Sequence, residues 1–408
     1  MVRAAFRRYH AAYRGLPRDV WLLAIVLFVN RSGTMVLPFL TLYLTRHLDF
    51  TEAAAGQMIT VYGLGSIAGA YLGGRMSEKW GAFRVQTVCM ALSVPLMVLL
   101  PFCSNHRQIA ATLLLLAVIY EAVRPANATA LAKVTTADTR TRAFALQRLA
   151  ANLGFSFGPA IGGWIATIDF QLLFFVDAAT SLLAAIALLY FFRMRRVENP
   201  EAVAECTTGS VAPLRDYRFV LFLALAFVTH VVFIQLLVTY PLYLRDHFEL
   251  TKKQIGLMFA VNTSIIVLCE MVLIDCVKHW PVYRLIGWGS FLCCAGFGML
   301  PFGSSGTYCV LAMIVLTVGE MLSFPTAAAY ASHQGPPGSE ARYLSWYIVA
   351  NSLAWVVGPA LGAGIYHNHR EMLWLSCFAV GPLILAGYQT LAHTRQAPAP
   401  PGHKNTPI

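Results

Sequence analysis

The stretch LYLTRHLDFTEAAAG (residues 42–56) recurs 200 residues later as LYLRDHFELTKKQIG (residues 242–256). The same offset aligns EKWGAFR (78–84) with KHWPVYR (278–284), and FGPAIGG (157–163) with VGPALGA (357–363). One offset that holds without a gap over separated stretches is hard to attribute to chance and indicates an internal repeat. The sequence therefore predicts a chain built from two structurally similar halves.

The repeat consists of long apolar blocks. Of the 408 residues, 58% are hydrophobic and 12% are charged, whereas soluble globular proteins have roughly 25% charged residues. A transmembrane helix needs about 20 mainly apolar residues. Twelve blocks of this kind are separated by charged or turn residues: 20–44, 54–75, 85–103, 108–131, 143–166, 171–192, 217–243, 254–277, 284–302, 307–331, 342–366 and 371–392. They are too long and too uniformly apolar for the strands of a membrane barrel, so we expect helices.

Six blocks fall in each repeat, which also aligns Pro125 with Pro325 and Arg142 with Arg342. We therefore predict an all-α integral membrane protein with twelve transmembrane helices in two pseudo-symmetric six-helix bundles. Two such halves, related by an axis along the membrane normal, define one architecture of secondary transporters. The expected parts are an N-terminal bundle (1–192), a cytoplasmic linker (193–216), a C-terminal bundle (217–392) and a cytoplasmic tail (393–408).

The basic residues predict the orientation. With both termini on one side, that side has 22 of the 30 Lys and Arg residues, including four in 133–148, and the other side has six. Because loops rich in Lys and Arg stay in the cytoplasm, we expect cytoplasmic termini in a multi-pass protein of a cell membrane, the inner membrane of a bacterium. The charges are scattered over short loops, which argues against a nucleic-acid-binding patch. The first block lacks a small-residue cleavage site, so we expect a retained span and not a signal peptide.

The loop GRMSEKWGAFR (74–84) resembles the loop between helices two and three of the major facilitator superfamily, Gly-x-Leu-Ala-Asp-Arg-x-Gly-Arg-Arg. The residues in common are Gly74, Lys79, Gly81 and Arg84, whereas Glu78 replaces the usual Asp, and Ala82 and Phe83 replace basic residues. The resemblance covers the whole chain. It implies that this is a conformational gating loop, in which Glu78 locks the two halves together on the cytoplasmic side, near Arg342. The alternative is a solvated turn whose charges only set the orientation.

The fifth predicted span contains GFSFGPAIGG (154–163), with four glycines and a proline in an apolar run. Glycines four residues apart let another helix approach closely, and proline permits a bend because it removes a backbone hydrogen bond. A pattern of helix five in the drug:proton antiporter (multidrug efflux) branch, GxxxGPxxGG, is similar to Gly154, Gly158, Pro159, Gly162 and Gly163. The similarity implies a hinge and seal associated with export. Simple helix packing is the alternative, and the related pattern in the eleventh span weakens the direction signal.

Six ionisable residues inside the predicted spans are candidates for a cavity that binds substrate and protons: Arg31, Glu121, Arg124, His230, Glu270 and Glu320. Such residues are costly in a membrane and usually face a water-filled cavity. The resemblance implies that helices one, four, seven and ten line the cavity, and five of the six residues lie on these helices. Glu121 and Arg124 are three residues apart and share a helix face, where they could form an ion pair. For each residue the alternative is a buried structural pair.

Motifs of other function classes are missing or lie in the wrong setting. There is no Walker GxxxxGK[ST] loop, no HExxH and no Cys/His cluster with metal-ligand spacing. GLGSIA (63–68) fits a dinucleotide fingerprint, but it lies inside a span with no strand before it. We therefore expect no enzyme, no cofactor, no metal site and no nucleic-acid partner. The expected partners are a small-molecule substrate, protons and the lipid bilayer, with a monomer as the working unit.

Three function classes remain after these exclusions. The favoured prediction is a secondary active transporter that exports amphipathic, drug-like molecules in exchange for protons by rocker-switch alternating access. In this scheme substrate and proton compete for Glu121 or Glu320. The alternative is a proton-coupled importer of a nutrient such as a peptide, sugar or siderophore, because a cavity with both acids and arginines also suits zwitterions. A receptor or enzyme on the same scaffold is the remote third class.

Overall fold

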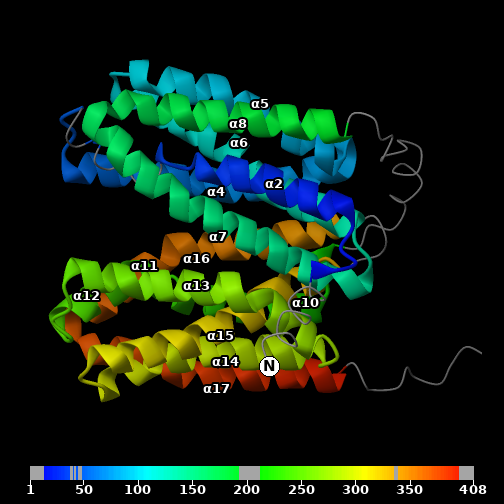
Figure 1. Cartoon of the computed structure of the whole chain (residues 1–408), viewed down its shortest axis with the longest axis vertical. Coiled ribbons are helices and arrows are strands. Elements are labelled where there is room, and N and C mark those ends of the chain that lie inside the picture. The colour runs from blue at the N-terminus through cyan, green and yellow to red at the C-terminus, as the bar shows by residue number, and fades with distance from the viewer. Residues whose placement is uncertain are drawn as a thin grey trace, which may run out of the picture.

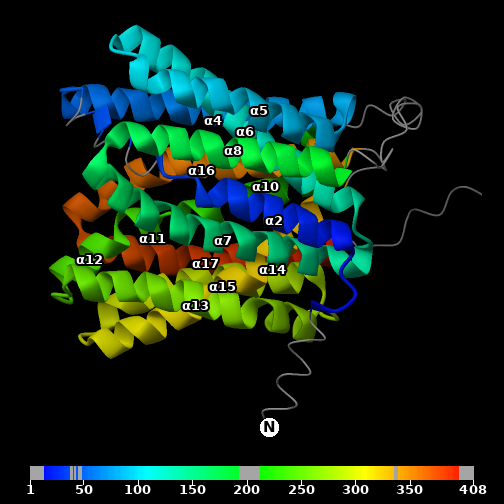
Figure 2. The same cartoon turned by 45° about the horizontal axis from the view of Figure 1, so that its top comes forward.

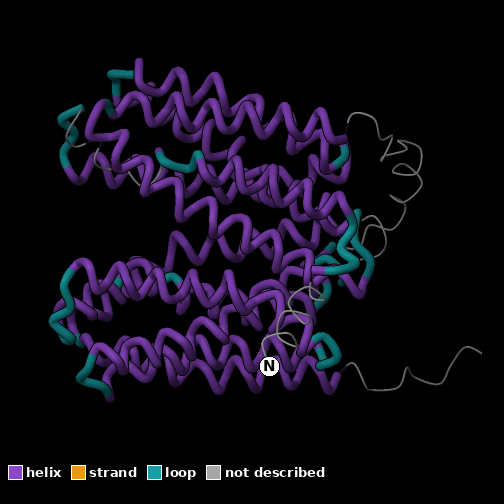
Figure 3. Tube along the Cα trace, viewed as in Figure 1, coloured by secondary structure: helices purple, strands orange, loops and turns teal. Residues whose placement is uncertain are grey.

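The computed structural model describes residues 13–36, 40, 43–44, 48–192, 212–334 and 339–394. Within these ranges the chain forms helices and connecting loops, without a β-strand (Figure 3). Most of the predicted linker (193–216) and of the predicted tail (393–408) lies outside the described residues.

The N-terminal and C-terminal halves are two helical bundles that lie one above the other in Figure 1. The first contains α2 (Arg18–Ser32), α4 (Glu52–Trp80), α5 (Ala82–Leu99), η1 (Leu100–Phe102), α6 (His106–Lys133), α7 (Ala137–Ile168) and α8 (Phe170–Phe192). The second contains η3 (Pro213–Arg215), α10 (Tyr217–Phe233), α11 (Gln235–Val238), α12 (Tyr240–Asp246), α13 (Lys252–Val277), α14 (Val282–Met299), η4 (Leu300–Phe302), α15 (Gly306–Ala331), α16 (Glu340–Asn368) and α17 (Arg370–Thr394).

The 200-residue offset holds in the backbone as well as in the sequence. Asp49 and Glu249 are the described non-glycine residues with positive φ, at 51° and 53°. Thr51 and Thr251 then cap α4 and α13, each accepting a hydrogen bond from a backbone N–H three residues later. A threonine oxygen at this position satisfies a donor that the helix itself leaves unpaired. The repeat in the sequence is therefore a repeat of turns and caps, which sets the same path for both halves.

The predicted spans correspond to helices, but three of them are shorter or less apolar than the rest, and the seventh is divided. Nine described segments are long and apolar enough to cross a membrane by themselves: α5 with η1, α6, α8, α10 with α11, α13, α14 with η4, α15, α16 and α17. The other three spans correspond to α2, with 15 described residues, and to α4 and α7, which are long but rich in glycine or charged residues.

The seventh predicted span, 217–243, was expected as one helix, and that expectation is wrong. The structure divides it into α10, α11 and α12, with breaks at Ile234 and Thr239. Pro241 lies in the first turn of α12, where a proline is tolerated because its missing N–H needs no helical partner. The same proline could not continue a helix that began at Tyr217 without losing a backbone hydrogen bond.

Two equivalent helices, α7 and α16, form the boundary between the halves. Both run between the two groups of helices in Figure 1, and Figure 2 shows the same helices after a turn of 45°; each packs against two helices of the other half. The α7 interface is the contact of α7 with α13 and α15, and the α16 interface is the contact of α16 with α4 and α6. Since α7 and α16 end at equivalent places in the repeat, at Ile168 and Asn368, the two interfaces are related by the pseudo-symmetry of the chain.

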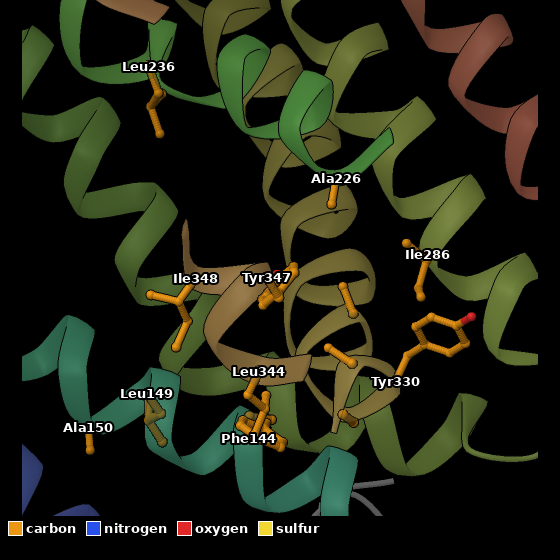
Figure 4. Packing of buried hydrophobic residues seen from close by; sticks show 14 of the residues in the cluster. Phe144, Leu149, Ala150, Ala226, Leu236, Ile286, Tyr330, Leu344, Tyr347 and Ile348 are labelled. Atoms are coloured by element: carbon orange, nitrogen blue, oxygen red, sulfur yellow. The ribbon is translucent and has the colours of Figure 1, made fainter. Parts of the chain in front are cut away.

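The apolar core shows where the halves touch. One cluster of buried residues includes both halves, with Phe144 and Leu149 of α7 together with Leu344 and Ile348 of α16 (Figure 4). A second cluster, which includes Met35, Tyr43, Phe50 and Phe174, contains buried residues of the N-terminal half only. The four named residues of α7 and α16 lie in the first half of each helix, toward the end where α4 ends at Trp80 and α16 begins at Glu340, which we call the closed end.

Candidate functional site

An ion pair joins the halves at the closed end. Glu78, in the last turn of α4, accepts hydrogen bonds at Oε2 from Nη2 and Nε of Arg342, at 2.8 and 3.1 Å. Arg342 lies in the first turn of α16, and both side chains are partly exposed, by 15% for Glu78 and 36% for Arg342. The acid of the loop thus contacts the start of the eleventh span, the place where the resemblance puts its partner.

The repeat produces a second, weaker pair of the same kind. Arg142 on α7, the equivalent of Arg342, has its Nη1 atom 3.9 Å from Oδ1 of Asp275 on α13. Asp275 also pairs with Lys278 at 3.1 Å. Each of the two interfaces therefore has an arginine near the start of its central helix and an acid near the end of the facing helix.

A third polar contact at the closed end involves a histidine. Arg140 on α7 donates from Nη1 to Nδ1 of His333, at 3.2 Å, just beyond the end of α15. Burial first, and then the positive charge of Arg140, hold the pKa of His333 below its ordinary value of 6.5, while Glu340 opposes this shift. A nitrogen that accepts from a guanidinium has no proton of its own, so the contact is made by neutral His333.

The glycines of the predicted gating loop have definite structural roles. A Cβ atom on Gly74 would overlap the side chain of Ser345 and lie 3.0 Å from the carbonyl oxygen of Ala341, so this glycine permits the close approach of α4 and α16. Gly81 separates α4 from α5 with φ of 88°, a conformation that favours glycine. Lys79 lies over the ring of Trp80, and Arg84 is exposed in the first turn of α5.

The glycines of the fifth span pack inside the N-terminal half. A Cβ on Gly154 would lie 2.7 Å from Cβ of Arg31 and 2.9 Å from the Phe28 carbonyl, and one on Gly158 would lie 3.1 Å from the Thr34 carbonyl. Their neighbour is therefore the end of α2 and not the other half. Gly162 is buried. The backbone of α7 is helical at Pro159 and Gly163, and the structure describes no further contacts of these two residues.

The most deeply buried charged contact between the halves, among the described residues, joins three side chains that the sequence analysis did not predict to meet. Arg148 on α7 donates from Nε to Oε1 of Glu270 on α13 at 2.7 Å, and from Nη1 to Oε1 of Glu320 on α15 at 2.7 Å. The side chains are 15%, 0% and 7% exposed, respectively. Asn262 on α13 donates to the second oxygen of Glu320 at 3.0 Å. One guanidinium from one half thus holds two buried carboxyl groups of the other.

The assignment of Arg148 to a cytoplasmic loop is wrong. The charge count placed it with the basic residues of 133–148, but α7 begins at Ala137, so Arg148 lies about three turns inside the helix. The signal was present in the sequence, because Arg148 falls within the apolar block 143–166. Among the described residues, the basic residues that remain near the closed end still outnumber those near the other end.

Glu121 and Arg124 form the ion pair that their spacing indicated. Arg124 Nη1 lies 3.0 Å from Oε2 of Glu121, and Nη2 donates to Oδ1 of Asn351 on α16 at 3.2 Å. The pair therefore belongs to the α16 interface and reaches the other half through an uncharged amide. Asn351 is a further contact residue that the sequence reading missed, because an isolated asparagine in an apolar block has no distinctive pattern.

The remaining two candidates lie among aromatic rings. The guanidinium of Arg31 lies 5.7 Å from the ring centroid of Tyr120, whose hydroxyl is hydrogen bonded to Thr34. His230 is buried, has Nδ1 2.7 Å from the Ala226 carbonyl, and stacks on Phe324 with 4.9 Å between centroids. The six candidates are therefore distributed over four places, and Glu270 and Glu320 are the two that Arg148 joins across the halves.

Among the described residues, no group of three or more His, Cys, Asp and Glu side chains is placed to hold a metal ion. The site consists instead of charged and polar residues where two helical bundles meet within their spans. The pattern that defines the Major Facilitator Superfamily matches residues 20–387. The chain belongs to this superfamily. It is a multi-pass membrane transporter of a small molecule, not an enzyme, with the superfamily fold of twelve helices in two bundles.

Individual members of the superfamily are distantly similar. An uncharacterized transporter of Bacillus subtilis, YttB, is 25% identical over 389 residues, covering 93% of this chain and 96% of that protein. Multidrug resistance protein 1 of the same organism is 25% identical over 280 residues, covering 67% and 71%. A bacterial homologue of the iron transporter ferroportin, solved in an outward-facing state, has a TM-score of 0.74 at 13% identity and covers 92% of this chain and all of that one. The likeness to the solved structure shows the same fold.

Proposed function

We propose that this transporter exports amphipathic small molecules in exchange for protons by rocker-switch alternating access, in the inner membrane of a bacterium. The single observation that carries the proposal is that ionisable side chains of both halves meet inside the spans, where Arg148 contacts Glu270 and Glu320. Ionisable groups at such a depth mark ion and substrate pathways in transporters. Their contacts cross the boundary along which the halves of a rocker switch separate.

The direction of opening follows from charge. Among the described residues, the closed end has more Lys and Arg than the opposite end, so we expect from the positive-inside rule that it faces the cytoplasm. The ion pair of Glu78 with Arg342 then closes the cytoplasmic side, which corresponds to an outward-facing transporter. In the opposite arrangement these contacts separate and the charged centre opens to the cytoplasm.

The choice of cargo rests on similarity and on the aromatic setting. The similar Multidrug resistance protein 1 has resistance to multiple drugs in its name, and Arg31 and His230 lie against rings that suit an amphipathic molecule. A thermal-shift screen of the purified protein at two pH values is the way to choose a cargo for transport assays, since a ligand that binds the folded state raises its melting temperature.

Transport in proteoliposomes tests the proposal. An imposed pH gradient is expected to drive flux of the selected amphipathic dye in the wild-type protein, and Glu121→Gln and Glu320→Gln are each expected to reduce it at least about tenfold while the protein stays folded. Glu371→Gln, at an exposed carboxyl in the first turn of α17, is the matched control and should transport normally. Normal pH-driven flux in both test variants would remove these residues from the coupling role.

A further inference from the structure

We propose that Arg148, Glu270 and Glu320 form a proton switch between the two halves. When the two halves come together at the closed end, this cluster takes up one proton, which Glu270 holds. This inference rests on the proton-driven export proposed above and names the site at which the coupling occurs. It also gives Arg148, a residue of the other half, the role of positioning the two carboxyl groups.

Charge balance is the first step. The cluster contains two carboxyl groups and one guanidinium, and its three side chains are at most 15% exposed. With both carboxyls ionised, the cluster has a net negative charge in a site with little water, and an unpaired buried charge is very costly. One added proton makes the cluster neutral. In the closed arrangement the favoured composition is therefore one guanidinium, one carboxylate and one protonated carboxyl group.

The hydrogen bonds indicate which carboxyl group is protonated. Both oxygens of Glu320 accept a hydrogen bond, one from Arg148 and one from Asn262, as an ionised carboxylate requires. Glu270 differs, because Arg148 contacts only its Oε1 atom, at 2.7 and 2.6 Å. Its Oε2 atom is buried, and within the described part of the chain no donor bonds to it. A buried oxygen without a donor costs less on a neutral group than on a charged one, so the proton belongs on Glu270.

The other titratable groups around the cluster do not supply the proton. Cys293 on α14 and Tyr347 on α16 both lie near Arg148. An ordinary thiol and an ordinary phenol are already neutral at neutral pH, and burial keeps them so. Arg124 on α6, which also lies near Tyr347, remains charged throughout. The two carboxyl groups are therefore the members of this site whose protonation can change in the physiological range.

Separation of the halves reverses the balance. Arg148 belongs to α7, and both acids belong to the other half. When the halves separate at the closed end, the guanidinium therefore moves away from the two carboxyl groups and water reaches them. A hydrated glutamate is ionised at neutral pH, so the proton leaves toward the cytoplasm. The acids are then free to bind a positively charged group of a cargo molecule. On closing, Arg148 and a proton from the outer side replace that group, which is the direction that proton-driven export needs.

A distance measurement on the full chain tests the switch without any transport. Trp80→Cys and Trp280→Cys place labels at two exposed, repeat-equivalent positions on opposite halves at the closed end, in a background where reactive native cysteines are replaced. If closing takes up one proton, the ratio of closed to open molecules rises about tenfold for each unit that the pH falls, the linkage relation for one proton. Glu371→Gln is the matched control and should keep this response.

The variants separate the roles of the two acids. Glu270→Gln imitates the protonated group, so its closed fraction should be higher than that of the wild type at high pH and should no longer depend on this proton. Glu320→Gln also makes the cluster neutral without a proton, but it leaves an ionised Glu270 with an unpaired buried oxygen, so its closed fraction should be lower than that of Glu270→Gln. The opposite order of these two variants would assign the proton to Glu320 and overturn the proposal. Arg148→Gln leaves two acids without a cation, so half-closure should move to lower pH.

Three further outcomes decide against the proposal or separate it from the proposed function. Closure at pH 9 that is driven by sodium ions, and not by choline, would make this a metal-cation site and overturn the proton assignment. A closed fraction that is independent of pH in the wild type would also overturn it, even if proteoliposomes show pH-driven export. Conversely, a normal pH response without export in proteoliposomes would leave the switch in place and reject the proposed function.

Discussion

The α7 and α16 interfaces are equivalent by the repeat but differ in chemistry. In the middle of the α7 interface, Arg148 joins two carboxyl groups of the other half. The equivalent positions of the α16 interface are Ile348, Ala70 and Tyr120, none of which is charged. There Ser345 donates a hydrogen bond to the Ala70 carbonyl oxygen at 2.7 Å, and Gly74 allows α4 and α16 to touch.

This difference shows which parts of a duplicated scaffold can diverge. The turns, caps and end contacts remain alike in both halves, as the pairs of Arg142 and Arg342 show. These features set the path of the chain and must be present twice. The centre of each interface has no such constraint, so one interface can be closely packed at these positions while the other holds an ion-paired cluster that crosses between the halves. We expect the close packing of the α16 interface to determine how stable the closed arrangement is. We expect the charged cluster of the α7 interface to determine the pH at which the halves come together.

The largest effect is expected from breaking the close packing of the α16 interface. In Gly74→Leu, the new side chain overlaps Ser345 and approaches the Ala341 backbone. Overpacking of this kind costs about 1–3 kcal/mol, which lowers the ratio of closed to open molecules roughly five- to a hundredfold. The label distance between positions 80 and 280 measures it. Gly256→Leu is the control, because nothing lies within 4 Å of a Cβ at that glycine; an equal response in both variants would reject the packing role.

A second prediction separates packing within a half from packing between halves. A side chain at Gly158 meets the backbone carbonyls of Thr34 and Ser32 in the same half, whereas one at Gly63 meets only a methyl group of Val356 across the α16 interface, at 3.3 Å. Backbone atoms cannot move aside as a valine methyl can. Gly158→Leu should therefore reduce transport several-fold more than Gly63→Leu. Equal transport by both variants would show that the glycines of the fifth span are a packing convenience and would remove their support for export.

The ion pairs at the closed end are expected to affect closure less than the packing does, and the pair of Glu78 is expected to matter more than that of Asp275. Glu78→Ala removes a bond of 2.8 Å to Arg342, and a partly exposed pair at a helix end contributes about 1 kcal/mol or less. The ratio of closed to open molecules should fall by up to about fivefold. Asp275→Ala removes the 3.9 Å contact with Arg142 and should change the label distance less. An unchanged distance in Glu78→Ala would show that the pair does not hold the closed end.

The smallest expected effect is a pH dependence at His333. Its pKa is below the ordinary value in the closed arrangement, through burial and Arg140, and returns toward that value when the contact opens. The contact therefore stabilises closure above about pH 6.5 and loses this contribution as the pH falls. The sign is opposite to that of the central switch, so the measurement belongs in the Glu270→Gln background. There the closed fraction should fall slightly at pH 5.5, and His333→Gln should abolish the change.

Much of the fold could be predicted because it rests on local patterns. Apolar blocks gave the spans, and the repeat predicted the equivalence of turns such as those at Asp49 and Glu249. The ion pair of Glu121 and Arg124 followed from helical spacing alone. The break in the seventh span was missed because Pro241 lies inside a block that remains apolar on both sides.

The central site could be predicted only in part, because its contacts depend on tertiary structure. Glu270 and Glu320 were identified as costly charges in spans, but nothing in their spacing shows that both reach one arginine. Arg148 lies near the basic start of its helix, so its charge was attributed to orientation. Asn262 and Asn351 have no periodic signal at all. A pairing between residues that are 122 or 172 positions apart requires the packing of the two bundles to be known.

The paired arginines at the closed end have a consequence for symmetry. In a twofold homodimer, residue i of one subunit contacts residue j of its partner, and j contacts i. Arg142 with Asp275, and Arg342 with Glu78, approximate this isologous form inside one chain, because the two arginines are equivalent in the repeat and the two acids lie three positions apart in it. A true homodimer would have to carry every charged cluster twice, once on each side of its axis. Fusion of the two subunits into one polypeptide removes that obligation, so this protein can place a single cluster of Arg148 and two glutamates off the axis.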